Sequence, residues 1–136
     1  MITMFWTFLD YVDSSGSNQI EAWLEALPVG ARKPVRAKLA AILLTADAQQ
    51  RLQPPHFEPL QGKGEFKVTF KLNNVQYRML ASYGPGRREV TLLAGAIEKN
   101  DRYRPLNVFD AAATRRAEIL SDRKRVTPTC LLQKSN

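Results

Sequence analysis

The chain has 136 residues, a length typical of one domain, and carries 20 Lys and Arg against 13 Asp and Glu, a formal net charge of +7. Its single histidine and single cysteine, Cys130, exclude an intramolecular disulfide and a Cys/His zinc cluster, and they favour a reducing, cytoplasmic setting. The charge favours a polyanionic partner, first a nucleic acid and second an acidic protein; the alternative is that the basic excess serves only solubility.

The N-terminal segment, MITMFWTFLDYV, is apolar but too short to span a bilayer, and we expect a β-strand over residues 2–12. Asn18 and Glu21 resemble a capping box at the start of a short helix, which Pro28 ends. From residue 31 an apolar stripe at helical spacing predicts a second, longer helix. The two helices are expected to pack as an antiparallel hairpin.

The stretch over residues 51–64 contains three prolines and two glycines, and this composition predicts an extended connector. A hairpin follows it, because Asn73-Asn74 suits a two-residue type I′ turn between two alternating segments. The turn sets apolar residues opposite one another in three pairs: Leu72 with Val75, Phe70 with Tyr77, and Val68 with Met79. A second turn, near residues 84–87, is expected to set Ala81 opposite Val90 in a third strand.

After Pro105, Asn107 is expected to cap a final helix with an apolar stripe. The order of elements is then β-α-α-β-β-β-α. It predicts an α+β fold over residues 1–121, in which an antiparallel sheet packs on a helical hairpin and a C-terminal helix is added. Residues 122–136 are basic and lack a sustained period, so we expect them to form a flexible tail.

One face of the expected hairpin gathers positive charge. Its register places Arg78 across from Thr69 and diagonal to Lys67 and Lys71, and the alternation of the third strand places Lys99 on the same face. Flanking segments contribute further candidates: Lys63 and His56 before the hairpin, and Arg102, Tyr103 and Arg104 after it. Cations contact phosphates and a ring stacks on a base, so this patch suits a phosphodiester. The alternative is an ordinary solvated face.

The same groups are compatible with RNA cleavage by its own 2′-hydroxyl. That reaction needs a base for the hydroxyl, cations for the pentavalent phosphorane and an acid for the leaving 5′-oxygen, and it needs no metal. Cationic neighbours lower the pKa of a lysine, so a lysine within the cluster can serve as the base. The residues alone leave open whether the face cleaves RNA, binds it or only faces water.

Four motifs connect the chain with a known family: PLQGKGEFK (59–67), QYRML (76–80), GAIEKNDRYRP (95–105) and DAAATRR (110–116). In this order and spacing they resemble the RelE/ParE superfamily of type II toxin–antitoxin toxins, most closely its phage-derived, HigB-like branch. That branch typically has a Pro-containing connector into the first hairpin strand, a Y-R pair in the next, a lysine closing the third, and a helix with A-x-x-R.

The resemblance implies a cofactor-free, metal-independent endoribonuclease that cuts translated mRNA at the ribosome and is neutralised by a helix-turn-helix antitoxin. It also implies that Lys67 and Arg78 contact the scissile phosphate and that Lys99 belongs to the site. Glu65 matches the motif glutamate and is interpreted as a partner of Arg78 or Arg116 rather than as a base. Arg116 and His56 are auxiliary candidates, with solvation and packing as their alternatives.

Three departures from the family pattern bear on catalysis. Ala96 replaces the usual Phe before the closing lysine, and Lys99 is followed by Asn100 where the family often has a second lysine. Phe109 occupies the approximate helix position of a catalytic tyrosine, which makes Tyr103 the candidate substitute. Two alternatives therefore remain: a ParE-like inhibitor of DNA gyrase without nuclease activity, and a catalytically decayed, phage-derived binding protein.

Overall fold

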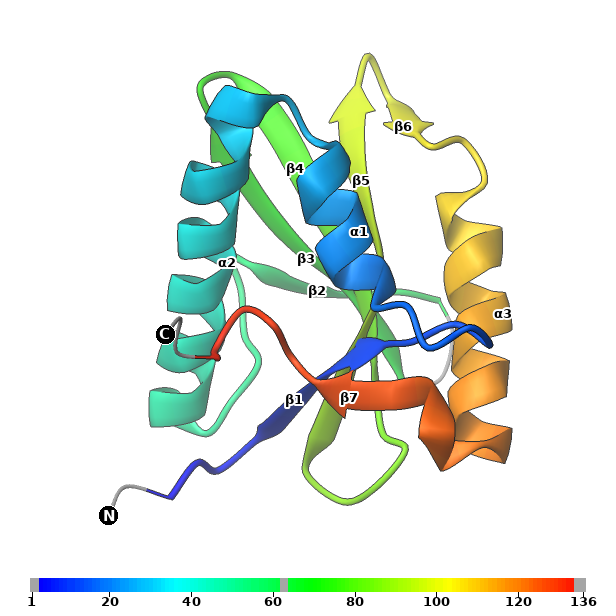
Figure 1. Cartoon of the computed structure of the whole chain (residues 1–136). Helices are drawn as coiled ribbons and strands as arrows, with labels where there is room; N and C mark the ends of the chain where they lie inside the picture. The colour runs from blue at the N-terminus through cyan, green and yellow to red at the C-terminus, as the bar shows by residue number, and fades with distance from the viewer. Residues whose placement is uncertain (1–2, 62–63, 134–136) are drawn as a thin grey trace.

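The computed structural model describes residues 3–61 and 64–133. In chain order its elements are β1 (Thr7–Tyr11), α1 (Gln19–Ala26), α2 (Val29–Gln49), β2 (Phe57–Pro59), β3 (Glu65–Leu72), β4 (Val75–Tyr83), β5 (Glu89–Lys99), β6 (Arg102–Arg104), α3 (Val108–Ser121), the 3₁₀ turn η1 (Arg123–Arg125) and β7 (Val126–Pro128) (Figure 1). This arrangement confirms the α+β class. The sheet is larger than expected, because β2, β6 and β7 have only three residues each and leave no readable alternation.

The seven strands form one mixed, open sheet in the order β2-β3-β4-β5-β1-β7, with β6 also paired to β5. The expected antiparallel meander of β3, β4 and β5 lies at its centre. β1 runs parallel to the first half of β5, from Glu89 to Leu92, whereas β6 pairs with the last three residues of β5. The two strands therefore share one edge of β5.

The first hairpin has the predicted register. Leu72 lies opposite Val75, and the pairing continues to Glu65 opposite Ser82 without interruption. Asn73 and Asn74 both have positive φ angles, 47° and 63°, as a type I′ turn requires. Local turn chemistry therefore determines this part of the sheet.

The second hairpin does not have the predicted register. Ala81 pairs with Leu92 rather than Val90, a shift of two residues that keeps each side chain on its expected face. A β-bulge between Leu80 and Ala81 then shifts the pairing by one more residue, and a one-residue shift reverses the faces of everything beyond it. The prediction that Lys99 shares a face with Arg78 is wrong for this reason.

Helices cover both faces of the sheet. On one face, α1 and α2 run in opposite directions and bury a core that includes Leu24, Leu39 and Met79 (Figure 1). On the other face, α3 packs Val108 and Ile119 in a second core that includes sheet side chains such as Leu80 and Leu93. The part of this face that packs against α3 is therefore apolar, although the alternation of the hairpin predicts a polar face, and the polar residues lie beside that part. None of the described helices has both the length and the apolar composition to cross a bilayer.

The helix starts agree only in part with the predictions. Asn18 caps α1, since its Oδ1 accepts hydrogen bonds from the backbone N–H groups of Ile20 and Glu21 at 2.9 and 3.0 Å. Glu21 does not complete a capping box; its carboxylate instead pairs with Arg36 on α2 at 2.7 Å. Asn107 precedes α3 but makes no side-chain capping hydrogen bond.

The prediction of a flexible tail from residue 122 onward is wrong for the described part, 122–133; residues 134–136 lie outside the described residues. β7 pairs antiparallel with β1, and Leu131 is buried in the first core. The buried carboxylate of Asp10 accepts a hydrogen bond from the backbone N–H of Cys130 at 2.8 Å. Side-chain anchors from distant elements, rather than a hydrophobic period, hold this segment in place, so the sequence pattern does not reveal it.

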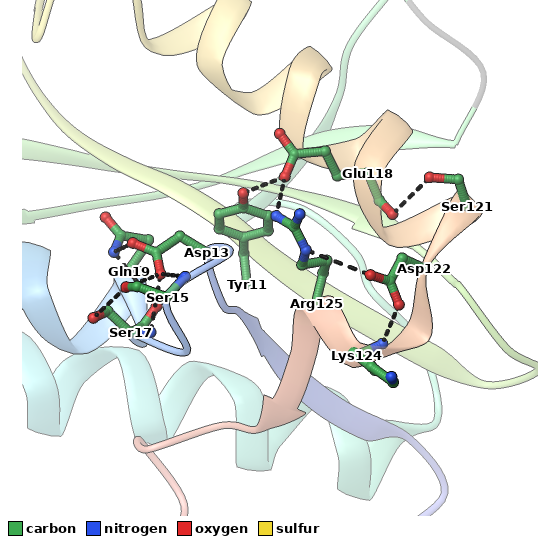
Figure 2. A network of polar contacts seen from close by, with 10 residues as sticks. All are labelled: Tyr11, Asp13, Ser15, Ser17, Gln19, Glu118, Ser121, Asp122, Lys124 and Arg125. Carbon is green, nitrogen blue, oxygen red and sulfur yellow. Dashed lines mark hydrogen bonds and ion pairs between the residues drawn. The ribbon is translucent and has the colours of Figure 1, made fainter.

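A polar network fixes η1 against α3 and β1. Figure 2 shows that the Tyr11 hydroxyl and the Arg125 guanidinium both reach the carboxylate of Glu118 on α3. Arg125 also lies 3.6 Å from Asp122, whose side chain caps η1 by accepting from the Lys124 N–H at 3.0 Å. Arg125 belongs to the segment that was expected to be a free basic tail, but in the fold it is paired with two acids.

Candidate functional site

The polar part of the α3-covered face is centred on Lys67 of β3 and Tyr103 of β6. Tyr103 pairs with Glu98 of β5, and Glu98 lies on the same side of β5 as Ala96, the residue opposite Arg78. Tyr103 therefore lies on the same face of the sheet as Arg78. Lys67 Nζ donates a hydrogen bond to Tyr103 Oη over 3.2 Å and lies 5.9 Å from the centre of its ring. The structure thus joins two predicted site residues that are 36 positions apart in the sequence.

Both members of this pair have further neighbours. The Lys67 side chain is 18% exposed and lies 3.7 Å from the carboxylate of Glu58 on the edge strand β2. The Tyr103 ring packs edge-on against Phe109 in the first turn of α3, with the centroids 4.8 Å apart. Phe109 is 40% exposed, so one side of the pair carries an aromatic surface that a base can stack on.

Arg78 lies on the adjacent strand, diagonal to Lys67, and is already occupied. Its Nε donates to Glu98 at 2.9 Å, its Nη2 to the Gln76 side chain at 2.6 Å, and its Nη1 to the Tyr77 carbonyl at 2.9 Å. The Arg78 and Glu98 side chains are only 13% and 18% exposed, so this ion pair is shielded from bulk water. These contacts use three of the five N–H donors of Arg78, and a phosphate that approaches it must compete with the carboxylate of Glu98.

The other candidates before and within the first hairpin have mainly structural surroundings. Glu65 shares the face of Lys67, but it makes no ion pair with any described residue, and the partner of Arg78 is Glu98 instead. His56 Nδ1 lies 2.8 Å from the Thr69 carbonyl oxygen, which fastens the segment before β2 to β3. Lys63 lies outside the described residues.

Arg116 extends from α3 to the start of β3. Its Nη2 lies 3.1 Å from the point that a Cβ on Gly64 would occupy, so the guanidinium packs closely against this glycine. Its Nε is buried and has no hydrogen-bond partner among residues 3–61 and 64–133. Among the described residues, Arg116 makes no hydrogen bond or ion pair with Lys67 or Arg78.

The remaining three candidates lie on the opposite side of the β5–β6 hairpin. Lys99 and Arg102 pair across the hairpin, and Arg104 pairs with Ile97, which places all three on the face away from Arg78. The predicted basic cluster is consequently divided in two by the hairpin. Lys67, Arg78 and Tyr103 form one group, and Lys99, Arg102 and Arg104 form the other.

Sequence reasoning missed two acids and one ring of this site. Glu58 lies on a three-residue strand inside the Pro-rich connector, and Glu98 faces Arg78 only because of the bulge in the second hairpin. Phe109 was noted only for its missing hydroxyl. The sequence of β5 does not reveal the bulge, so it does not show that Glu98 lies on the face of Arg78. Among the described residues, no group of three or more His, Cys, Asp and Glu side chains is arranged to hold a metal ion.

Comparison of the chain with protein-family models, curated proteins and solved structures finds no match. The resemblance to RelE/ParE toxins therefore rests on the four motifs, and the site must be interpreted from its own chemistry. That chemistry is a lysine and a tyrosine hydroxyl in hydrogen-bond contact, an arginine held by a glutamate, a second carboxylate and an exposed ring.

Proposed function

We propose that the protein is the toxin of a type II toxin–antitoxin system, a RelE-like, metal-independent endoribonuclease that cuts translated mRNA at the ribosome. The observation that carries the proposal is the hydrogen bond between Lys67 and Tyr103, because it brings a cation and a proton-transferring hydroxyl to one point of a basic protein. A helical hairpin on one face of the sheet, with a C-terminal helix on the other, supports the RelE-like arrangement. A small helix-turn-helix antitoxin is the expected neutralising partner.

The proposed reaction is attack by the ribose 2′-oxygen on the adjacent phosphorus. The new P–O2′ bond forms a 2′,3′-cyclic phosphate as the P–O5′ bond breaks. The Lys67 ammonium offsets the charge of the phosphorane, and Tyr103, whose oxygen accepts from Lys67, keeps its own proton to give to the leaving 5′-oxygen. Glu58, which pairs with Lys67, accepts the 2′-hydroxyl proton. Phe109 provides the stacking surface for a neighbouring base.

Tyr103→Phe tests this assignment, because it removes the hydroxyl and keeps the ring against Phe109. We expect cleavage of mRNA on translating ribosomes to fall by at least about 100-fold, the typical contribution of one acid–base group. Tyr83→Phe is the matched control, since Tyr83 is an exposed tyrosine of β4 on the opposite face. If Tyr103→Phe cleaves mRNA and arrests growth as wild type does, the catalytic assignment fails.

A second candidate is an RNA-binding protein without nuclease activity. The shielded Arg78–Glu98 pair favours it, because an arginine neutralised by a carboxylate stabilises the charge of the phosphorane less than an unpaired one does. Cleavage products ending in a 2′,3′-cyclic phosphate distinguish the two functions, since a binding protein yields none. Expression that triggers a DNA-damage response rather than translational arrest would instead indicate a ParE-like gyrase inhibitor.

A further inference from the structure

The basic side of the β5–β6 hairpin differs from the Lys67–Arg78 cluster in how its charge is balanced. Lys99, Arg102 and Arg104 are exposed and line an open hollow of about 770 Å³ together with Asn100 and Leu106. None of the three cations forms an ion pair with a described residue. Lys67 and Arg78 on the other side are each paired with a glutamate. The positive charge available to an external anion is therefore greater on the hairpin than at the predicted catalytic cluster.

The pairing of β5 with β6 brings like charges together, which is unfavourable when no anion is bound. Lys99 and Arg102 are direct cross-strand partners, and like charges in that position repel. The acid between them in sequence, Asp101, lies in the turn and makes no ion pair with either within the described part of the chain. Glu98, the preceding residue, points to the other face and binds Arg78. An anionic ligand would relieve the repulsion that these neighbours leave uncompensated.

Spacing and shape favour a nucleic-acid backbone as that ligand. Arg102 and Arg104 are two positions apart on one strand, so their Cα atoms are separated by about 7 Å, and they offer two planar guanidinium groups in a row. Guanidinium groups bind phosphate oxygens in bidentate geometry, and a nucleic-acid strand offers a phosphate at every nucleotide, so one backbone can engage both arginines. The exposed Leu106 and the hollow beside it leave space for a sugar or a base.

We propose that the β5–β6 hairpin is a second RNA-binding element, which holds the sugar–phosphate backbone of RNA on the side of the hairpin opposite the Lys67–Tyr103 pair. The inference rests on the proposed function in so far as the bound polyanion is RNA. It assigns Lys99 to backbone binding rather than to catalysis. A strand that crosses the hairpin is then held on one side and cut on the other.

The test is binding of a fluorescent single-stranded RNA about 20 nucleotides long whose riboses are 2′-O-methylated, which prevents cleavage by the 2′-hydroxyl. Affinity is measured by anisotropy over a range of salt concentrations for the variant Lys99→Gln/Arg102→Gln/Arg104→Gln. Losing three phosphate contacts should reduce the slope of log K against log salt by about 2, since each contact to a single strand contributes about 0.7. Cleavage of mRNA on translating ribosomes is measured in parallel, so that nuclease activity and binding by the hairpin are followed separately.

The matched control is Lys33→Gln/Arg51→Gln/Arg87→Gln, which removes the same charge from exposed cations outside the hairpin. Equal changes of slope in the two triple variants would overturn the proposal, because net charge alone would then explain binding. Competition by poly-L-glutamate at the strength of RNA would also overturn it in favour of an acidic protein partner. If wild type cleaves nothing while the hairpin variant alone loses binding, the nuclease function fails and the binding element stands. If the hairpin variant keeps wild-type binding and cleavage persists, the proposed binding element fails and the nuclease function stands.

Discussion

Gly95 of β5 provides the sharpest test of the packing between the sheet and α1. A Cβ atom at this position would lie 2.3 Å from Cδ2 of Trp23 and 2.4 Å from its Cε2. Carbon atoms in contact are about 3.5 Å apart, so Gly95→Ala requires the indole to move by roughly 1 Å or more. The indole can move only if α1 shifts or Trp23 adopts a different rotamer.

Steric strain opposes the usual effect of this substitution. Replacing glycine by alanine within a strand normally stabilises a protein by about 0.5–1 kcal/mol, whereas overpacking of a well-packed site costs about 1–3 kcal/mol. We expect the packing cost at Gly95 to exceed the gain, because three ring atoms of Trp23 fall within 3.0 Å of the new carbon. A net loss of about 1–2 kcal/mol corresponds to a decrease in Tm of roughly 4–8 °C for a domain of this size.

The assay is urea unfolding followed by circular dichroism, with thermal unfolding in parallel. Gly30→Ala is the control, since a Cβ at Gly30 of α2 meets nothing within 4 Å, and it should leave stability unchanged or raise it by up to about 1 kcal/mol. In a Trp23→Ala background the cost of Gly95→Ala should disappear. A Gly95→Ala protein as stable as wild type, or an equal cost in both backgrounds, would refute the packing described here.

Two further predictions concern carboxylates. Glu98→Gln keeps the shape of the side chain but removes the charge that holds Arg78. We expect tighter binding of 2′-O-methylated RNA and a slope of log K against log salt that is steeper by up to about 0.7. An unchanged affinity would mean that Arg78 contacts no phosphate. Burial raises the pKa of Asp10, although hydrogen bonds from Cys130 and Asn18 oppose the shift. The folded protein therefore keeps this proton at a pH where the unfolded chain has lost it, so Asp10 makes stability fall as pH rises from about 4 through its raised pKa. Asp10→Asn should remove this contribution, and a pH-independent difference between the two unfolding free energies would contradict the assignment.

Sequence reasoning succeeded where local signals determine the structure. The stripe of α2 and the Asn73-Asn74 turn depend on neighbours a few residues apart, and both were predicted. The face of Lys99 was not predicted correctly, because the bulge inserts Leu93 of β5 into the pairing, and Leu93 is neither a glycine nor a proline. The position of Tyr103 could not be read either, since β6 has three residues and takes its register from β5.

The candidate site shows the same division. The hairpin register placed Lys67 and Arg78 on one face, as the structure has them. Their neutralising partners were missed because Glu58 and Glu98 approach from other strands, whose pairing depends on tertiary contacts. A cluster that looks strongly cationic in sequence is for that reason largely balanced in the fold. Within the predicted cluster, the cations without an acidic partner among the described residues lie on the β5–β6 hairpin, where Lys99 and Arg102 are paired across the strands.

The position of β1 determines the order in which the sheet can assemble. β1 lies between β5 and β7, and its pairing of Tyr11 with Val126 joins residues more than a hundred positions apart. On the ribosome, Thr7–Tyr11 emerges long before either neighbouring strand has been synthesised, and no local contact can hold it in the sheet. The meander and the helical hairpin can form as the chain grows, whereas β1 must wait for β5 on one edge and for β7 on the other. Pairing over such distances is slow, so completion of the sheet is a late step that follows synthesis of β7 rather than accompanying it.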